Sequence, residues 1–286
     1  MANLKELRSR ITSVSSTMQI TSAMKMVSAA KLNRAQDAIT KMRPYSQKLT
    51  ELLQSLSATL EGDTGSKYAE QREVKKVLIV AISSNRGLAG AFNTNIVKGV
   101  RNLVQTQYAG KDVELLTLGK KAADVLKKSF SIAKNNNAIY DTLDYAHVAE
   151  IAEDLMQLFL EEKYDEIVII YNQFRNAATQ IVTTEQFLPI QKFETDENVT
   201  LDYIFEPDKL EIVKDLIPKS LKMQLFKAMS DSLAAEHGAR MTAMHKATDN
   251  ATELRDALKL SYNKARQASI TNEILEIVGG AEALNN

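Results

Sequence analysis

Residues 4–32 read LKELRSRITSVSSTMQITSAMKMVSAAKL, and apolar side chains return in this stretch at alternating intervals of three and four residues. The same spacing continues to Leu60, so that 13 of the 17 positions it selects between Leu4 and Leu60 are apolar. The chain's overall apolar content of 44% would place only about seven or eight there by chance. This heptad repeat predicts a coiled-coil helix over residues 1–61, roughly 55 residues and on the order of 80 Å long.

A second helical segment is predicted at the other end of the chain, over residues 208–286. Asp208 can cap its first turn, and Glu211 can complete a capping box three residues later. Alanines recur every fourth residue from Ala235 to Ala251, and such small side chains predict close approach to a partner helix. The expected seam then continues through Ala251, Leu254, Leu258, Ser261, Ala265, Ala268, Asn272 and Leu275. We expect an antiparallel coiled coil between the two ends, and a helix stop at Gly279-Gly280.

The middle of the chain, residues 62–207, predicts a separate α/β domain. It holds 14 of the 17 aromatic residues, which favour sheets and globular cores. Short apolar runs typical of buried parallel strands occur at 76–82, 113–118 and 166–171, with later strands, possible edges, at 179–188 and 201–205. Helical stretches are expected near 95–107, 120–128 and 147–162. The sequence therefore predicts a Rossmann-like α/β domain inserted between two coiled-coil helices.

Composition excludes several classes of protein. The chain has no cysteine, which rules out disulfides, thiol catalysis and zinc bound by thiolates. Its 36 basic residues balance 36 acidic ones, which argues against a nucleic-acid-binding protein. No run approaches the ~18 apolar residues of a membrane span. His147, His237 and His245 do not fall at metal-ligand spacing, so we expect neither a metal nor a cofactor.

The best candidate for enzyme chemistry is the glycine turn, residues 83–93, which read SSNRGLAGAFN. The turn follows a predicted buried strand and precedes a helix, where backbone N–H groups can cradle a phosphate and Arg86 adds a positive charge. Its spacing nevertheless matches neither the dinucleotide fingerprint nor the P-loop. Glycine is also needed for the geometry of such a turn, and this structural interpretation is favoured over nucleotide binding.

Two stretches of the predicted coiled coil carry apolar residues outside the seam. Around Met24 and Lys25 the seam positions become polar, while Ile20, Met26 and Val27 lie off the seam. Near the C-terminus a second stripe leaves the seam, at Ile270, Ile274 and Ile277. A local stutter that shifts the phase of the seam explains both stretches. A surface gripped by other proteins explains them equally well, and the sequence leaves the two explanations open.

Three long stretches resemble the gamma subunit of F-type ATP synthases, in the order found in that family. They are ITSAMKMVSAAKL at 20–32, GARMTAMHKATDNAT at 238–252 and YNKARQASITNEILEIVGGAEAL at 262–284. The glycine turn is similar to the family's central motif, with Asn85 where an Asp is common, and Gly238 stands where an Ala is usual. The cysteine-bearing insert of the chloroplast members is missing, so thiol control is not expected. An initiator Met and no transit peptide favour a bacterial chain.

The resemblance implies a non-catalytic rotor subunit that transmits rotation between the membrane c-ring and the catalytic ring of alpha and beta subunits. It implies that the chain lies peripherally on the cytoplasmic side of the cell membrane and also binds the epsilon subunit. The implied ring contacts are Met24, Lys25, Arg240, Gln267, Thr271, Ile270, Ile274 and Ile277. The implied contacts with the c-ring and epsilon are Tyr203, Phe205, Glu206 and Asp208. The alternative is a nucleotide-binding α/β enzyme whose helices serve dimerisation.

Overall fold

A computed structural model of the chain describes residues 4–59, 67–140, 143–190 and 209–284. The chain forms two compact units. Residues 1–28 and 241–286 make up one, called here the two-helix unit, and residues 29–240 make up the other, the α/β unit. The two longest helices, α1 (Leu4–Thr59) and α5 (Lys209–Leu284), each contribute residues to both units.

The α/β unit contains one five-stranded sheet in the order β3-β2-β1-β4-β5. Four strands run parallel, namely β1 (Lys76–Ile82), β2 (Asp112–Leu118), β3 (Ser131–Asn136) and β4 (Glu166–Phe174). The fifth, β5 (Gln180–Leu188), pairs with β4 antiparallel and forms an edge. This mixed sheet confirms the predicted α/β domain.

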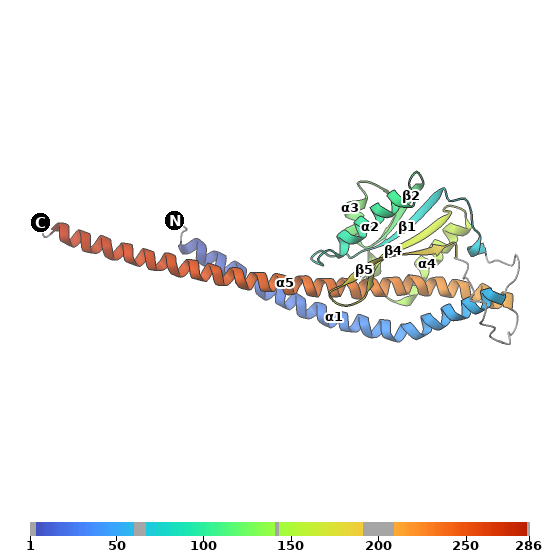
Figure 1. Cartoon of the computed structure of the whole chain (residues 1–286), viewed down its shortest axis with the longest axis horizontal. Helices are drawn as coiled ribbons and strands as arrows, with labels where there is room; N and C mark the ends of the chain where they lie inside the picture. The colour runs from blue at the N-terminus through green and yellow to red at the C-terminus, as the bar shows by residue number, and fades with distance from the viewer. Residues whose placement is uncertain (1–3, 60–66, 141–142, 191–208, 285–286) are drawn as a thin grey trace. The chain divides into compact units, whose positions relative to one another are not determined.

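Helices cover both faces of this sheet (Figure 1). On one face α2 (Phe92–Thr106) and α3 (Lys120–Leu126) pack against alternate residues of β1, β2 and β4. On the other face α4 (Tyr145–Leu160) packs together with the part of α5 between 217 and 229. Two short 3-10 turns, η1 (Lys67–Ala69) and η2 (Ala138–Tyr140), complete the elements of the unit. The C-terminal helix is therefore part of the core of this unit.

The strands follow the hydrophobic pattern of the sequence where they are central. From Val77 to Ile82 every residue of β1 is buried, as expected for a strand with helices on both faces. Strand β3 was missed, because its sequence SIAKNN has only two apolar residues and forms an edge that needs little burial. The strand expected at 201–205 lies outside the described residues.

In the two-helix unit, α1 and α5 pack antiparallel to each other. The Thr21 hydroxyl lies 2.8 Å from that of Thr248, and the Thr252 hydroxyl lies 3.3 Å from the Met18 sulfur. Partner residues therefore rise in number on α5 as they fall on α1. The expected coiled coil between the chain ends is confirmed, and α1, with 56 residues, has close to its predicted length.

Three expectations about α5 were wrong in detail. The helix does not stop at Gly279-Gly280 but continues to Leu284. Its seam does not follow Leu254, Ser261 and Ala268, which are exposed. The partly buried positions next to them are Arg255, Tyr262 and Ser269. Counting apolar residues favoured Leu254, whereas the long stem of an arginine can cover the seam and leave its charge in water.

The third error concerns the alanine stripe, since Ala235 and Ala239 cluster with Ala89 and Phe92 of the α/β unit. Both expected domain boundaries, after residues 61 and 207, fall among residues outside the described ranges, as does Asp208.

Candidate functional sites on the two-helix unit and the glycine turn

The seam of α1 keeps a single phase through its polar stretch. Thr21 and Ser28 are buried, and Lys25 between them is partly buried. The Ser28 hydroxyl donates to the Met24 carbonyl at 2.7 Å, which satisfies it inside the helix. Polar side chains can thus occupy the seam without a change of phase, so the stutter explanation fails for this stretch.

The apolar residues beside this seam form an exposed second face on α1. Ile20, Met26 and Val27 are 61%, 63% and 57% exposed. Met24 is partly buried at the border between this face and the seam. Single exposed apolar residues are ordinary, but three within eight positions of one helix are typical of a contact surface.

The end of α5 carries a larger apolar surface. Every residue from Ile270 to Ala281 is exposed, including Ile274 and Ile277. Leu275 and Val278 are exposed as well, so exposed apolar side chains cover a broad face of this end of the helix. Within the two-helix unit the α1 helix begins at Leu4, and the spacing of the Met18 contacts places that end opposite residues near 266 to 269. Beyond them no residue of α1 that the structure describes covers α5.

Two polar residues expected at the ring contact lie one turn apart at the start of this exposed end. Gln267 and Thr271 are both exposed, and the Thr271 hydroxyl donates to the Gln267 carbonyl at 2.9 Å. The Gln267 carboxamide can therefore meet a partner chain.

The glycine turn, residues 83–93, is closed by its own hydrogen bonds. The Asn93 carboxamide accepts from the Ser84 backbone N–H at 3.0 Å and donates to the Ser84 hydroxyl at 2.9 Å. That hydroxyl in turn donates to the Arg86 carbonyl at 2.7 Å. Leu88 and Gly90 both have positive φ, +63° and +57°, and glycine adopts this conformation without strain.

The start of the turn also caps helix α3. The first three backbone N–H groups of this helix have no partner within it and need acceptors elsewhere. The Asn85 side chain accepts from Lys120, the Ser84 carbonyl from Lys121 and the Ser83 hydroxyl from Ala122, each at 3.0 Å. These hydrogen bonds engage the donors at the start of α3 and fix the turn to that helix, which favours the structural interpretation of the turn.

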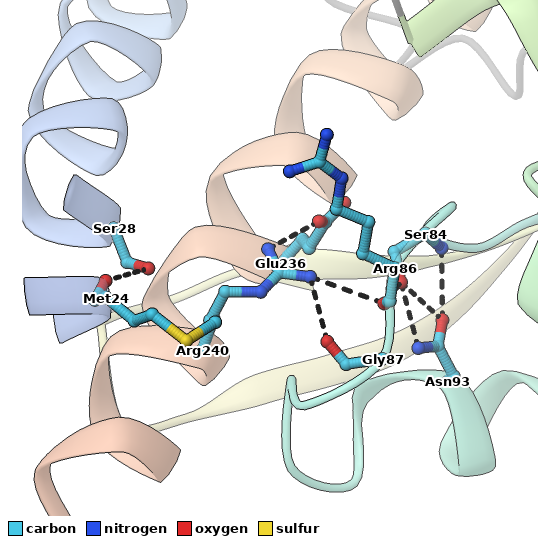
Figure 2. Close-up of polar contacts among 8 residues, drawn as sticks. All are labelled: Met24, Ser28, Ser84, Arg86, Gly87, Asn93, Glu236 and Arg240. Atoms are coloured by element: carbon cyan, nitrogen blue, oxygen red, sulfur yellow. Dashed lines mark hydrogen bonds and ion pairs between the residues drawn. The ribbon is translucent and has the colours of Figure 1, made fainter. Parts of the chain in front are cut away.

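Helix α5 holds the other side of the turn through a buried ion pair. Arg240 Nη1 donates to Glu236 Oε1 at 2.6 Å, and both side chains are about nine-tenths buried. Arg240 Nη2 lies 3.3 Å from the Arg86 carbonyl oxygen and 3.4 Å from that of Gly87 (Figure 2). The guanidinium thus joins one turn of α5 to the middle of the glycine turn.

Burial shifts the pKa values of both residues next to this arginine. Desolvation raises the pKa of Glu236, and the attraction of Arg240, Lys31 and Arg86 only partly offsets it. Burial lowers the pKa of His237 to about 4, and the positive charges of Arg240 and Lys31 add to this effect. The imidazole is therefore neutral at physiological pH.

The structure separates the residues expected at the ring contact into two groups. Those of the two-helix unit are exposed or partly buried, whereas Arg240 is buried within the α/β unit. The four residues expected to face the c-ring and epsilon, Tyr203, Phe205, Glu206 and Asp208, lie outside the described residues.

Sequence reasoning missed the roles of Glu236 and Gly238. A Glu four residues before an Arg is a recognisable ion-pair spacing, but its burial is not visible in sequence. A Cβ atom at Gly238 would lie 3.2 Å from the Ala177 Cα atom and 3.4 Å from the Phe174 ring. Gly238 therefore allows α5 to pack closely on the turn between β4 and β5.

Comparison with known proteins identifies the family. A family model described as ATP synthase matches residues 3–284. An ATP synthase gamma chain from Christiangramia forsetii is 76% identical over 285 residues, which cover 100% of each chain. This chain belongs to the ATP synthase gamma chain family. Another gamma chain, from Flavobacterium johnsoniae, is 68% identical over 286 residues and again covers 100% of each chain.

Solved structures give the same fold for this gamma chain. The rotor of the Euglena gracilis mitochondrial ATP synthase contains a chain that matches with a TM-score of 0.69 at 23% identity, covering 93% of this chain and 98% of that one. A second Euglena structure, of the OSCP/F1/c-ring assembly, contains a chain that matches with a TM-score of 0.72 at 23% identity, covering 98% and 94%. Among the described residues of the gamma chain, no helix is both long and apolar enough to cross a membrane.

Proposed function

We propose that this gamma chain is the central, non-catalytic rotor of an ATP synthase and transmits rotation between a membrane c-ring and a catalytic ring of alpha and beta subunits. The observation that carries the proposal is the free end of α5, whose apolar residues are exposed from Ile270 onward. A broad exposed apolar face is typical of a contact surface, and a surrounding protein collar would cover it.

The unlike faces of the two-helix unit explain how rotation can act on the ring. A bound partner shifts a conformational equilibrium only if it contacts one state better than another. The α1 face at Ile20, Met26 and Val27 is apolar, whereas on α5 the polar side chains of Gln267 and Thr271 lie among exposed apolar ones. Three equivalent catalytic subunits around such a rotor meet different chemistry at any moment, and each rotation exchanges their states.

The proposed contacts fall on three parts of the chain. Met24 and Lys25 would meet the beta subunit beside the apolar face of α1. Gln267 and Thr271 would bind polar loops of the ring, and Ile270, Ile274 and Ile277 would turn within an apolar bearing. Arg240 would contact the ring only by leaving its buried partner Glu236, at the cost of an unpaired buried carboxylate, so we assign it an internal role below.

The segment with Tyr203, Phe205, Glu206 and Asp208 is proposed to face the c-ring and the epsilon subunit. The chain would then lie at the cytoplasmic side of the cell membrane, held there by these partners.

A single cysteine tests this function, because the chain has none of its own. In the complete membrane-bound complex, Ile274→Cys should cross-link to a subunit of the catalytic ring through a short cleavable reagent that bonds to the thiol at one end and inserts into a neighbouring C–H bond on illumination at the other. ATP-driven proton pumping should then fall in proportion to the cross-linked fraction and return when the link is cleaved. The same variant without reagent is the control. Cross-linking that leaves pumping unchanged, or a cysteine that reaches no ring subunit, would contradict the rotor function.

A further inference from the structure

The last turn of α5 within the α/β unit buries charge. Between Ala234 and Arg240 every residue is buried, including Glu236, His237 and Arg240. Charged groups are rarely buried this deeply unless they are paired. A surface helix that only needed to pack on the sheet would fill these positions with apolar side chains.

The guanidinium of Arg240 uses its two ends differently. The Nη1 group forms the ion pair with Glu236 on the same helix. The Nη2 group lies within hydrogen-bonding distance of the carbonyl oxygens of Arg86 and Gly87. The planar fork of an arginine holds its donors in fixed directions, whereas a lysine ammonium is a compact charge whose donors rotate on a flexible stem. The ion pair thereby fixes the direction in which the Nη2 group points.

Apolar contacts also hold the glycine turn against α5. Ala235 and Ala239, on the turns next to the ion pair, cluster with Ala89 and Phe92 of the glycine turn. The Phe92 carbonyl is held in addition by the Asn172 side chain, from β4, at 3.1 Å. The glycine turn is thus bound on one side to the sheet and on the other to α5.

The contact between Arg240 and the glycine turn lies near the boundary between the two units. Arg240 is the last α5 residue of the α/β unit, and Met241 is the first α5 residue of the two-helix unit. Twist carried along α5 from one unit to the other passes through this part of the helix. A loose helix at this point would absorb part of the twist by local rotation.

We propose that Arg240 is a positioning residue that clamps the glycine turn to α5, so that rotation passes between the two units without loss. This inference rests on the proposed rotor function. The clamp acts through the carbonyl groups of Arg86 and Gly87 and needs no contact between Arg240 and the catalytic ring.

Arg240→Lys is the sharpest test, because it keeps the positive charge beside Glu236 and removes the fork. In the isolated full chain, backbone amide hydrogen exchange of residues 86–91 should rise about tenfold, the factor expected when one charge-assisted hydrogen bond is lost from a local opening equilibrium. In the complete complex, ATP hydrolysis should continue while protons pumped per ATP fall by about threefold or more. A purely structural loss would lower both rates together.

Arg255→Lys is the matched control. Arg255 is a partly buried arginine of the two-helix unit that pairs with Asp256 at 2.9 Å and has no link to the glycine turn. It should leave both measurements unchanged.

Four results would overturn the clamp. The first is unchanged exchange at 86–91 in Arg240→Lys, whatever happens to pumping. The second is faster exchange with normal pumping per ATP. The third is failure of Arg240→Lys to assemble where Arg255→Lys does. The fourth is an equal loss of pumping in Arg255→Lys. Failure of the unmodified chain to support pumping would instead contradict the rotor function, and the exchange measurement would still test the clamp.

Discussion

One helix, α5, is used in two different ways along its length. From Ile217 to Arg240 it is largely buried, and its leucines, alanines and even its charges have partners within the α/β unit. From Ile270 to Ala281 the same helix is exposed throughout, although it again carries isoleucine, leucine and valine. The hydrophobic content of a helix therefore does not show whether the chain itself covers it.

The difference separates stability from interaction. Apolar residues in the buried stretch contribute to the folding of the chain, because water is removed from them when the sheet packs. Apolar residues in the exposed stretch contribute nothing to that folding and are available to another protein. Substitutions of the same kind in the two stretches should thus have different effects.

The largest expected difference in stability is between substitutions at two apolar residues of α5, one buried and one exposed. Leu225→Ala should lower the free energy of unfolding of the α/β unit by about 3 kcal/mol, because Leu225 is fully buried and leaves a cavity. Ile277→Ala should change it by less than about 0.5 kcal/mol, because Ile277 is 71% exposed. Urea unfolding followed by circular dichroism and tyrosine fluorescence measures both. Similar losses in the two variants would show that the exposed end is covered by the chain itself.

The next comparison uses two glycines of the same helix. Gly238→Gln should destabilise the α/β unit by about 2 to 3 kcal/mol, because its Cβ would press on the Ala177 backbone and the Phe174 ring. Gly279→Gln meets no atom within 4 Å and should increase helix content at the C-terminus, since Gln favours helix over Gly by about 0.5 kcal/mol. Urea unfolding and far-ultraviolet circular dichroism give the two readouts. If Gly238→Gln leaves the free energy of unfolding unchanged, the turn between β4 and β5 can shift at little cost.

The smallest expected effect concerns pH. The pKa of His237 is lowered to about 4, and Arg240 and Lys31 are the charges that act on it. Between pH 6.5 and 4 the unfolded chain binds a proton that the folded imidazole does not, so this residue makes stability fall as pH falls. Relative to His237→Gln, the unmodified chain should lose about 2 kcal/mol more on going from pH 7.5 to 5.

Unfolding curves of the two chains at both pH values check this effect. Neighbouring Glu236 has a raised pKa and acts in the opposite direction, since its folded form takes up a proton first as pH falls. The substitution at His237 isolates one of the two contributions. The exposed residue His245 gives the control, and His245→Gln should behave like the unmodified chain. Parallel behaviour of all three chains would contradict the buried neutral histidine.

The sequence predicted strands correctly where both faces of the strand are buried. β1 and β4 are buried on both faces, so their runs of valine, isoleucine and leucine were sufficient. β3 is an edge strand whose backbone pairs with β2 on one side only, and its lysine and asparagines need no core. Its sequence therefore contains no strong signal.

The seams of α1 and α5 show a similar limit to what can be predicted from the sequence of a helix. On α1 the heptad count predicted each of the positions found buried, even the polar Thr21 and Ser28, because one phase persists over many turns. On α5 both apolar and long charged side chains occur near the seam. Counting apolar residues assigned Leu254 to the seam, whereas Arg255 is the partly buried position. The apolar residues that lie outside the seams of the two-helix unit could be recognised from the sequence, and the structure shows them exposed. The buried pair of Glu236 and Arg240 could not be recognised, since it depends on a turn some 150 residues away.

The amino-acid order alone determined that two long helices pair around an inserted α/β domain, because helix and strand periods are local properties repeated over many residues. Only the tertiary structure decided which faces of those helices are covered. It placed α5 on the sheet from Ile217 to Arg240, turned the arginine inward and left the last turns exposed. Burial depends on distant segments that meet in space, and no local pattern records which segments those are.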